Sequence, residues 1–202
     1  AEYPDPEAAL RDKLAPILSG RYEPDAKCAD GSFCGIKTQT YWQAQKTLEE
    51  KPAHVFMQEK SLFVRNFDDK AIEAAFDRVY RIPFNTNDDS CFKFFQTGQA
   101  VDKLAPGDTA FVHRGSQWLF DIEVNWDCET PNYQIQANLA WQQEFYQKIA
   151  GMVANSGSFQ NFADPSLRNG EWQKSYYGNN YSRLQRIKRD LDPGNFLQYE
   201  QS

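Results

Sequence analysis

The strictest alternation of apolar and polar residues in the sequence runs from Gln117 to Trp126. A period of two is typical of a β-strand, because successive side chains point to opposite faces of a sheet. We therefore expect a strand whose aromatic face lies in the core. The other face carries Asp121 and Glu123, which the pattern taken alone would expose to water. The apolar positions are Trp118, Phe120, Ile122, Val124 and Trp126.

Five segments are expected to be helical, most of them because apolar residues recur at intervals of three and four. In one of these segments Asp68 or Asp69 caps the helix, and in the longest Gly157 is expected as the stop. The five segments are Pro4–Leu18, Thr38–Glu50, Asp69–Tyr80, Tyr133–Asn155 and Tyr181–Leu191. The predicted buried face is Ile72, Ala75, Phe76 and Val79 in the third, and Leu139, Trp141, Phe145, Ile149 and Val153 in the fourth.

Three further strands are expected, at Lys60–Arg65, Cys91–Thr97 and Thr109–Val112. Helices and short strands are intermixed without a regular parallel unit, so the predicted fold class is α+β. At 202 residues the chain is long enough for one sizeable core. Its net charge of -6 and lack of a basic patch argue against nucleic acid as a partner. No apolar run approaches the length of a membrane span, and a metal site is not expected.

The chain contains four cysteines: Cys28, Cys34, Cys91 and Cys128. An even count, in a chain that starts at Ala1 and therefore looks processed, favours two disulfides and a secreted, extracellular protein. Three pairings are possible, and we expect Cys28–Cys34 and Cys91–Cys128. The alternative is four buried thiols.

The C-terminal part of the chain closely resembles the C-terminal signature of the berberine-bridge-enzyme-like, FAD-linked oxidases. The matching residues are Tyr176-Tyr177-Gly178-Asn179-Asn180, Arg183-Leu184, Lys188, Asp192-Pro193-Gly194-Asn195-Phe196 and Gln201-Ser202. Lys60-Ser61-Leu62-Phe63 and Thr109–Arg114 resemble two further segments of that family, so the resemblance spans about residues 60 to 202.

The resemblance implies a two-domain flavoprotein in which an antiparallel sheet backed by helices binds the substrate. Residues 1–157 would form that substrate domain, and residues 158–202 would return to the FAD domain. Asn180, Tyr176 and Tyr177 match residues placed near the flavin, although they could instead only pack the tail. The family's phosphate-binding segment and flavin-linking histidine have no counterpart here. FAD is therefore expected to be held mainly by a partner chain, in a heterodimer, or by a separate domain.

In this family the strand matching Gln117–Trp126 forms the floor of the substrate cavity, and an acid on it often serves as the base. Glu123 is the closest match to that acid, and Asp121 is next on the same face. The resemblance places Asn125, Phe159 and Phe162 at the substrate. Phe162 stands where sugar-oxidising members carry a tyrosine that acts as base, and a phenyl ring cannot accept a proton.

Two functions remain open at this stage. The first is the substrate-binding part of a secreted FAD-dependent oxidoreductase acting on an alcohol, sugar or related small molecule, active only when assembled with FAD. The second is a binding protein on the same scaffold, lectin-like or storage-type, whose catalysis is impaired. The phenylalanines at 159 and 162 favour the second function, and the C-terminal signature favours the first.

Overall fold

The computed structural model describes residues 8–10, 12–13, 39–48, 56–87, 90–168 and 170–201. The chain divides into two compact units, Ala1–Ala53 and His54–Ser202. In the first unit, α2 spans Tyr41–Leu48, inside the predicted helix Thr38–Glu50. Thr40 and Gln43 cap it reciprocally: each side chain accepts a hydrogen bond from the other's backbone N–H. The predicted helix Pro4–Leu18 and the pair Cys28–Cys34 lie largely or wholly outside the described residues.

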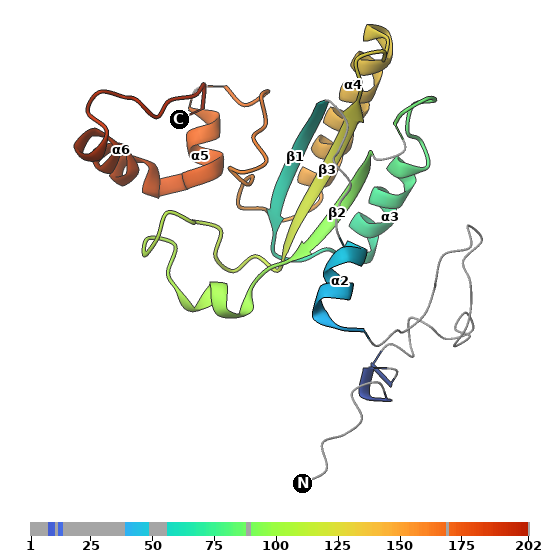
Figure 1. The fold of residues 1–202 in the computed structure, drawn as a ribbon, viewed down its shortest axis with the longest axis horizontal. Coiled ribbons are helices and arrows are strands. Elements are labelled where there is room, and N and C mark those ends of the chain that lie inside the picture. The colour runs from blue at the N-terminus through green and yellow to red at the C-terminus, as the bar shows by residue number, and fades with distance from the viewer. Residues whose placement is uncertain are drawn as a thin grey trace. The chain divides into compact units, whose positions relative to one another are not determined.

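The second unit is built on a three-stranded antiparallel sheet in the order β1-β3-β2 (Figure 1). Its strands are β1 (Phe56–Val64), β2 (Cys91–Gln96) and β3 (Trp118–Trp126). All three lie where the sequence predicts a strand, and the α+β class is confirmed. β3 is the central strand because both neighbours pair with it along its length.

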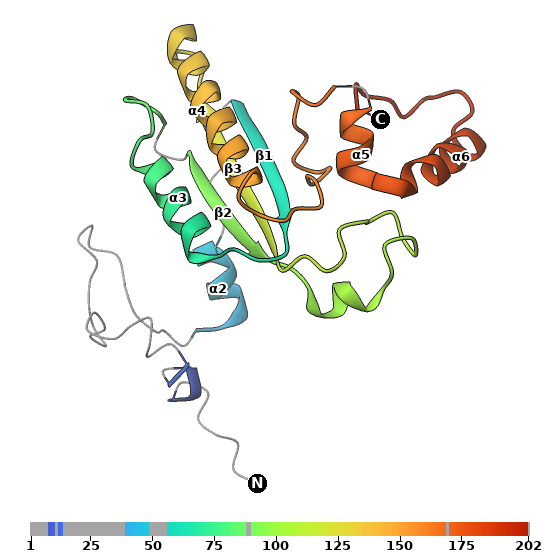
Figure 2. The same ribbon diagram turned by 180° about the vertical axis from the view of Figure 1, so that it is seen from behind.

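Helices α3 (Asp69–Val79) and α4 (Asn132–Ala150) pack on one face of this sheet. Figure 2, seen from behind, shows α4 lying across β1 and β3. Trp141, Phe145 and Ile149 of α4 meet the apolar side chains of β3 in one core cluster. The predicted core face of the strand is therefore the face that carries the helices.

The predicted buried face of α3 is wrong in part. Ala71, Ala74 and Ala75 are its buried residues, whereas Ile72 and Phe76 are exposed. Small alanine side chains let the helix backbone approach its neighbours closely, and the larger residues are displaced to the flank. Phe76 still meets the edge of the Phe92 ring, with centroids 5.7 Å apart. The predicted cap is confirmed, because the Asp68 side chain accepts a hydrogen bond from the Ala71 N–H.

The predicted end of the longest helix is also wrong. α4 ends at Ala150 with Gly151 as its C-cap, and the chain then pairs with the outer edge of β1 through Ser156 and Gly157. Gly157 has φ +112°, and a Cβ there would lie 2.2 Å from the Ser175 carbonyl oxygen. This glycine therefore permits close contact between two segments and does not stop a helix.

The predicted strand at Thr109–Val112 does not form. Side chains take the polar groups that a neighbouring strand would use: Arg114 donates to the Thr109 hydroxyl, and Asn180 donates to the Thr109 carbonyl. Asn180 belongs to the tail, which consists of α5 (Glu171–Tyr177), the short helix η2 (Gly178–Asn180) and α6 (Tyr181–Leu191). The helix stop predicted at Asp192 is confirmed.

The predicted Cys91–Cys128 disulfide is not formed. Cys91 lies opposite Glu123, and β3 continues three residues to Trp126 before Cys128 is reached. Three strand residues cover about 10 Å, which is beyond the reach of a disulfide. Among the described residues no helix is both long and apolar enough to cross a membrane. The domain boundary expected at residue 157 stays a prediction.

Candidate functional site

The sheet face opposite α3 and α4 carries the candidate site. Side chains alternate between the two faces along each strand, and this alternation brings polar residues of all three strands to this face. In the strand register Glu59 of β1 lies opposite Glu123, and both Ser61 of β1 and Lys93 of β2 lie opposite Asp121. The alternation taken alone predicts that this face meets water, but Asp121 is 0% and Glu123 6% exposed. Solvent exposure of the two acids is therefore excluded.

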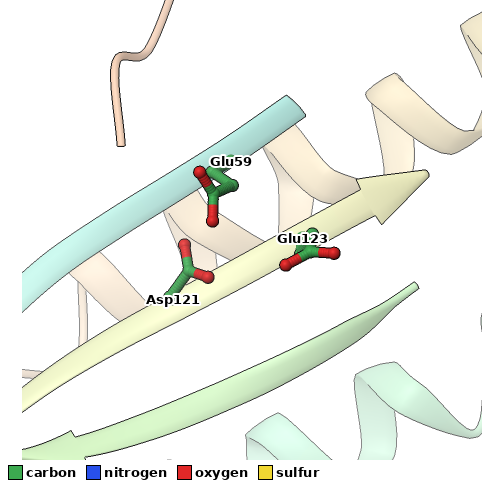
Figure 3. A group of neighbouring side chains, drawn as sticks. All are labelled: Glu59, Asp121 and Glu123. Atoms are coloured by element: carbon green, nitrogen blue, oxygen red, sulfur yellow. The ribbon is translucent and has the colours of Figure 1, made fainter. Parts of the chain in front are cut away.

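Three carboxylate groups gather at the middle of this face. One oxygen each from Glu59, Asp121 and Glu123 lies within 4.8 Å of the others, and Figure 3 shows the three side chains grouped across β1 and β3. Negative charges this close together disfavour one another. The groups around each acid therefore bear on which of the three carries a charge.

Glu123 has two partners that favour its charged form. Lys93 donates to its Oε2 atom, and the Asn125 side-chain amide donates to its Oε1 atom at 2.7 Å. Burial opposes a charge on Lys93, but the hydrogen bond to Glu123 prevails and raises the pKa of Lys93 above its ordinary value. The two side chains therefore form an ion pair at one end of the cluster.

Asp121 has the opposite environment. Neither of its carboxylate oxygens has a hydrogen-bond partner among the described residues. Burial, with a smaller contribution from Glu59, raises the pKa of Asp121 to about 8. Burial and the charge of Glu123 also raise the pKa of Glu59. At neutral pH the site thus holds a protonated acid, Asp121, beside Glu123, which is paired with a lysine. Different environments for two neighbouring carboxyl groups are how acid and base roles are separated in enzymes.

Aromatic rings cover the neighbouring part of the same face. The Phe159 N–H donates to the Ser61 hydroxyl at 3.0 Å, which holds the 158–162 segment against β1. The Phe159 ring meets Phe63 and Phe162 edge-on, and Phe162 lies 6.0 Å from the Phe95 ring. The structure therefore brings five predicted site residues to one sheet face. They are Asp121, Glu123, Asn125, Phe159 and Phe162.

The three residues expected near a flavin lie in the tail. The Tyr176 hydroxyl is buried, accepts from the Asp164 N–H at 2.8 Å and donates to Gln201 at 3.0 Å. The Asn180 amide donates to the carbonyls of Pro106 and Thr109. Tyr177 lines a cavity of about 600 Å³ between α5, α6 and the residues that follow α6. All three therefore pack the tail, and their contact with a cofactor stays a prediction.

His113 has a structural environment. Its ring stacks on Phe63 with centroids 4.2 Å apart, and its Nδ1 atom lies 3.1 Å from the Ser156 hydroxyl. Burial lowers the pKa of His113 to about 4, so the ring is neutral at physiological pH. His113 therefore has a packing role in the described part of the chain.

Sequence reasoning missed two members of the acid cluster, Glu59 and Lys93. The alternation in Cys91–Gln96 contains the signal for Lys93, because this lysine stands between Phe92 and Phe94 and must point to the opposite face. Glu59 lies just before the predicted start of its strand, so its face was not assigned. Both residues lie beside Glu123 because β1 and β2 each pair with β3, and this pairing is not visible in the sequence of any one strand.

Comparison with known proteins shows which group this arrangement resembles. The family model described as "Berberine and berberine like" matches residues 158–202, which include the tail and both phenylalanines. Residues 158–202 are therefore similar to the C-terminal segment of the berberine-bridge-enzyme-like proteins, and FAD-linked oxidoreductases are among the relatives of the chain. The matched segment carries part of the candidate site and all of the tail.

Two curated relatives show how much of a family member the chain represents. The uncharacterized FAD-linked oxidoreductase YgaK of Bacillus subtilis is 31% identical over 105 residues, 52% of this chain and 22% of the relative. The carbohydrate oxidase of Microdochium nivale is 25% identical over 151 residues, 71% of this chain and 30% of the relative. The chain therefore spans less than a third of the length of either oxidase.

The fold agrees with that of solved family structures. Berberine bridge enzyme from Eschscholzia californica aligns with a TM-score of 0.62 and 21% identity, over 72% of this chain and 32% of that chain. At this identity the comparison supports the fold alone. The fold of the described residues is therefore that of the berberine-bridge-like structures, and the reaction is a matter for proposal.

Proposed function

We propose that this chain forms the substrate-binding part of a FAD-dependent oxidoreductase that oxidises an alcohol, sugar or related small molecule. The observation that carries the proposal is the pair of buried acids in opposite environments, Asp121 without a hydrogen-bond partner among the described residues and Glu123 paired with Lys93, on a sheet face lined with aromatic rings. FAD-linked relatives support the cofactor. FAD, when bound, supplies the acceptor for a hydride.

The residues of this chain fit the proton-transfer half of such a reaction. Oxidation of an alcohol removes a hydride from carbon and a proton from the hydroxyl oxygen. Glu123, paired with Lys93, accepts that proton. Asp121 carries a proton of its own and is fully buried, so it adds no second negative charge beside the base. Phe159 and Phe162 form the apolar wall of the site.

We further propose that most FAD contacts are supplied by a partner chain or by another domain. The support is that Tyr176 and Asn180, the tail residues expected at the cofactor, direct polar atoms to groups of this chain. Secretion also stays a proposal. The Cys91–Cys128 disulfide, which would support secretion, is not formed. The remaining support from cysteines is the pair Cys28 and Cys34, which lies outside the described residues.

The test is substitution of the proposed base in the FAD-loaded protein. Glu123→Gln should slow anaerobic flavin bleaching by substrate about 10²–10⁴-fold, the usual worth of a positioned base. Reoxidation of the reduced flavin by oxygen should change little, because that step needs no proton transfer to Glu123. Glu129→Gln, at an exposed position just after β3, is the matched control and should bleach at the native rate. Unchanged bleaching in Glu123→Gln would remove this residue from the mechanism.

A binding protein on the same scaffold is the second candidate. It is favoured by one observation, that phenylalanine rings pack together at positions 159 and 162, where the family pattern has tyrosines. That reading predicts a purified protein that binds ligand without bleaching flavin. Bleaching by any alcohol, sugar or amine substrate excludes it.

A further inference from the structure

We propose that Lys93 is the positioning residue that makes Glu123 the base of this site and leaves Asp121 as the proton carrier. The inference rests on the proposed function, since it assigns the acid and base roles of that reaction. Lys93 lies on β2, the strand that contributes no acid to the cluster. It would act through Glu123 without touching the reacting atoms itself.

The side chain of Lys93 has two acids within its reach, Asp121 and Glu123. In the strand register Lys93 lies opposite Asp121, so its side chain starts beside that carboxyl group. Its ammonium group nevertheless donates to the Oε2 atom of Glu123, two residues further along β3. The lysine therefore leans away from the acid directly opposite it, and the more buried acid is left without a cation.

The charges around the cluster make this choice decisive. The titratable groups that act on it are Glu59 from β1, Cys91 and Lys93 from β2, and Asp121 and Glu123 from β3. Among these described groups Lys93 is the one cation, shared by three carboxyl groups. A cation and an amide donor both favour the charged form of a buried acid, and Glu123 has both. Burial, followed by the charge of Glu59, keeps the proton on Asp121, and the Lys93 charge opposes this only in part. The contact of Lys93 with Glu123 thus determines which of the two acids can serve as the base.

A divalent metal ion is a weaker account of the same cluster. The Lys93 ammonium group occupies one oxygen of Glu123 and the Asn125 amide the other, where a metal would need an open oxygen. A lysine and a proton neutralise the cluster with groups the chain already has.

The test compares pH profiles of flavin bleaching in the FAD-loaded protein. Without the Lys93 charge Glu123 should hold its proton to higher pH. Lys93→Met should therefore move the acidic limb of kcat/KM upward by at least about one pH unit, which corresponds to a tenfold change in the proton-binding equilibrium. At a pH well below the native midpoint the rate should then fall at least tenfold, and the rate on the alkaline plateau should recover. Lys93→Arg should restore the profile, and exposed Lys148→Met on α4 is the matched control.

A second readout separates this inference from the proposed function. Carbon-13 labelling of the Asp and Glu carboxyl groups allows Glu123 to be titrated by NMR in the FAD-loaded protein without substrate. Lys93→Met should raise the midpoint of Glu123, and Lys93→Gln serves if the methionine variant does not fold, because it keeps a donor but no charge. Suppose that Lys93→Met shifts the midpoint of Glu123 but Glu123→Gln bleaches flavin at the native rate. The proposed role of Glu123 as base would then be wrong, and the assigned interaction between Lys93 and Glu123 would stand.

The inference itself is overturned by two results. One is a Glu123-dependent enzyme whose pH profile and Glu123 midpoint are unchanged in Lys93→Met. The other is a native Glu123 midpoint that moves on addition of CaCl₂ and returns with EDTA, which would show that a metal ion sets the charge.

Discussion

At the scale of single residues, Asp121 has the most unusual environment. It is a fully buried carboxyl group without a hydrogen-bond partner among the described residues, and an ionised group in that position would be costly. The protein accommodates it as the protonated acid. A residue that lowers stability in this way fits a functional role better than a structural one.

This environment predicts a specific pH dependence of stability. The folded-state pKa of Asp121 is raised from 3.8 to about 8, so its contribution to stability is complete below about pH 4 and is lost as the pH rises towards 8. Asp121→Asn removes that loss and should stabilise the protein at pH 8 by a few kcal/mol, roughly the order that linkage gives for a shift of this size. The measurement is urea unfolding at pH 5 and pH 8.

Asp77→Asn on the exposed side of α3 is the control and should show no pH-dependent gain. Equal stability of native protein and Asp121→Asn at both pH values would mean that Asp121 is ionised and solvated.

At the scale of elements, the close contact between the segment after α4 and helix α5 depends on one glycine. Gly157→Ala would bring a Cβ to 2.2 Å from the Ser175 carbonyl oxygen, at a φ of +112° that an alanine rarely adopts. We expect a loss of about 1–3 kcal/mol or more in the free energy of unfolding. Gly194→Ala, where no atom lies within 4 Å of the added Cβ, is the matched control. Thermal melts that fall by the same amount in both variants would contradict this account.

The elements were largely predictable from the sequence because they depend on local periodicity and caps. The alternation in β3 and the Asp68 cap of α3 are examples. The errors arose where distant chain segments meet. The end of α4 depends on pairing of Ser156 and Gly157 with Phe63, and the missing strand at Thr109 depends on Asn180, 71 residues away.

The candidate site was predictable only in part, for the same reason. The acids of β3 and the phenylalanines were found from the strand pattern and the family resemblance. Lys93 and Glu59 join the site through the register of β2 and β1 against β3, which no local pattern specifies. The burial of Asp121 likewise depends on segments that pack on the sheet from elsewhere in the sequence.

At the scale of the whole molecule, α6 presents an apolar stripe with little to cover it. Leu191 is 82% and Ile187 42% exposed, and Phe196 just after the helix is 87% exposed. Large exposed apolar patches usually mark interaction surfaces. The sequence predicts that Tyr181, Leu184, Ile187 and Leu191 bury against an FAD-binding domain or chain.

This assembly prediction can be tested at Leu191. Leu191→Asp should weaken retention of FAD at least tenfold in the assembled protein, because a buried charge disrupts an apolar interface. Its melting temperature without FAD should equal that of the native protein, since the Leu191 side chain is exposed and packs little against the core of this chain. Lys188→Asp is unsuitable as a control because Lys188 binds Asp192, so exposed Asp190→Lys serves instead. Native FAD retention in Leu191→Asp would show that α6 faces solvent.

The strand order also bears on how the protein acquires its structure during synthesis. The central strand β3 is the last of the three in the sequence, and β1 and β2 make no ladder with each other. Synthesis must therefore reach Trp126 before either earlier strand has its whole partner. Until then the apolar residues of β1 and β2 remain open to other chains, so this topology makes folding slow to begin and dependent on protection from aggregation.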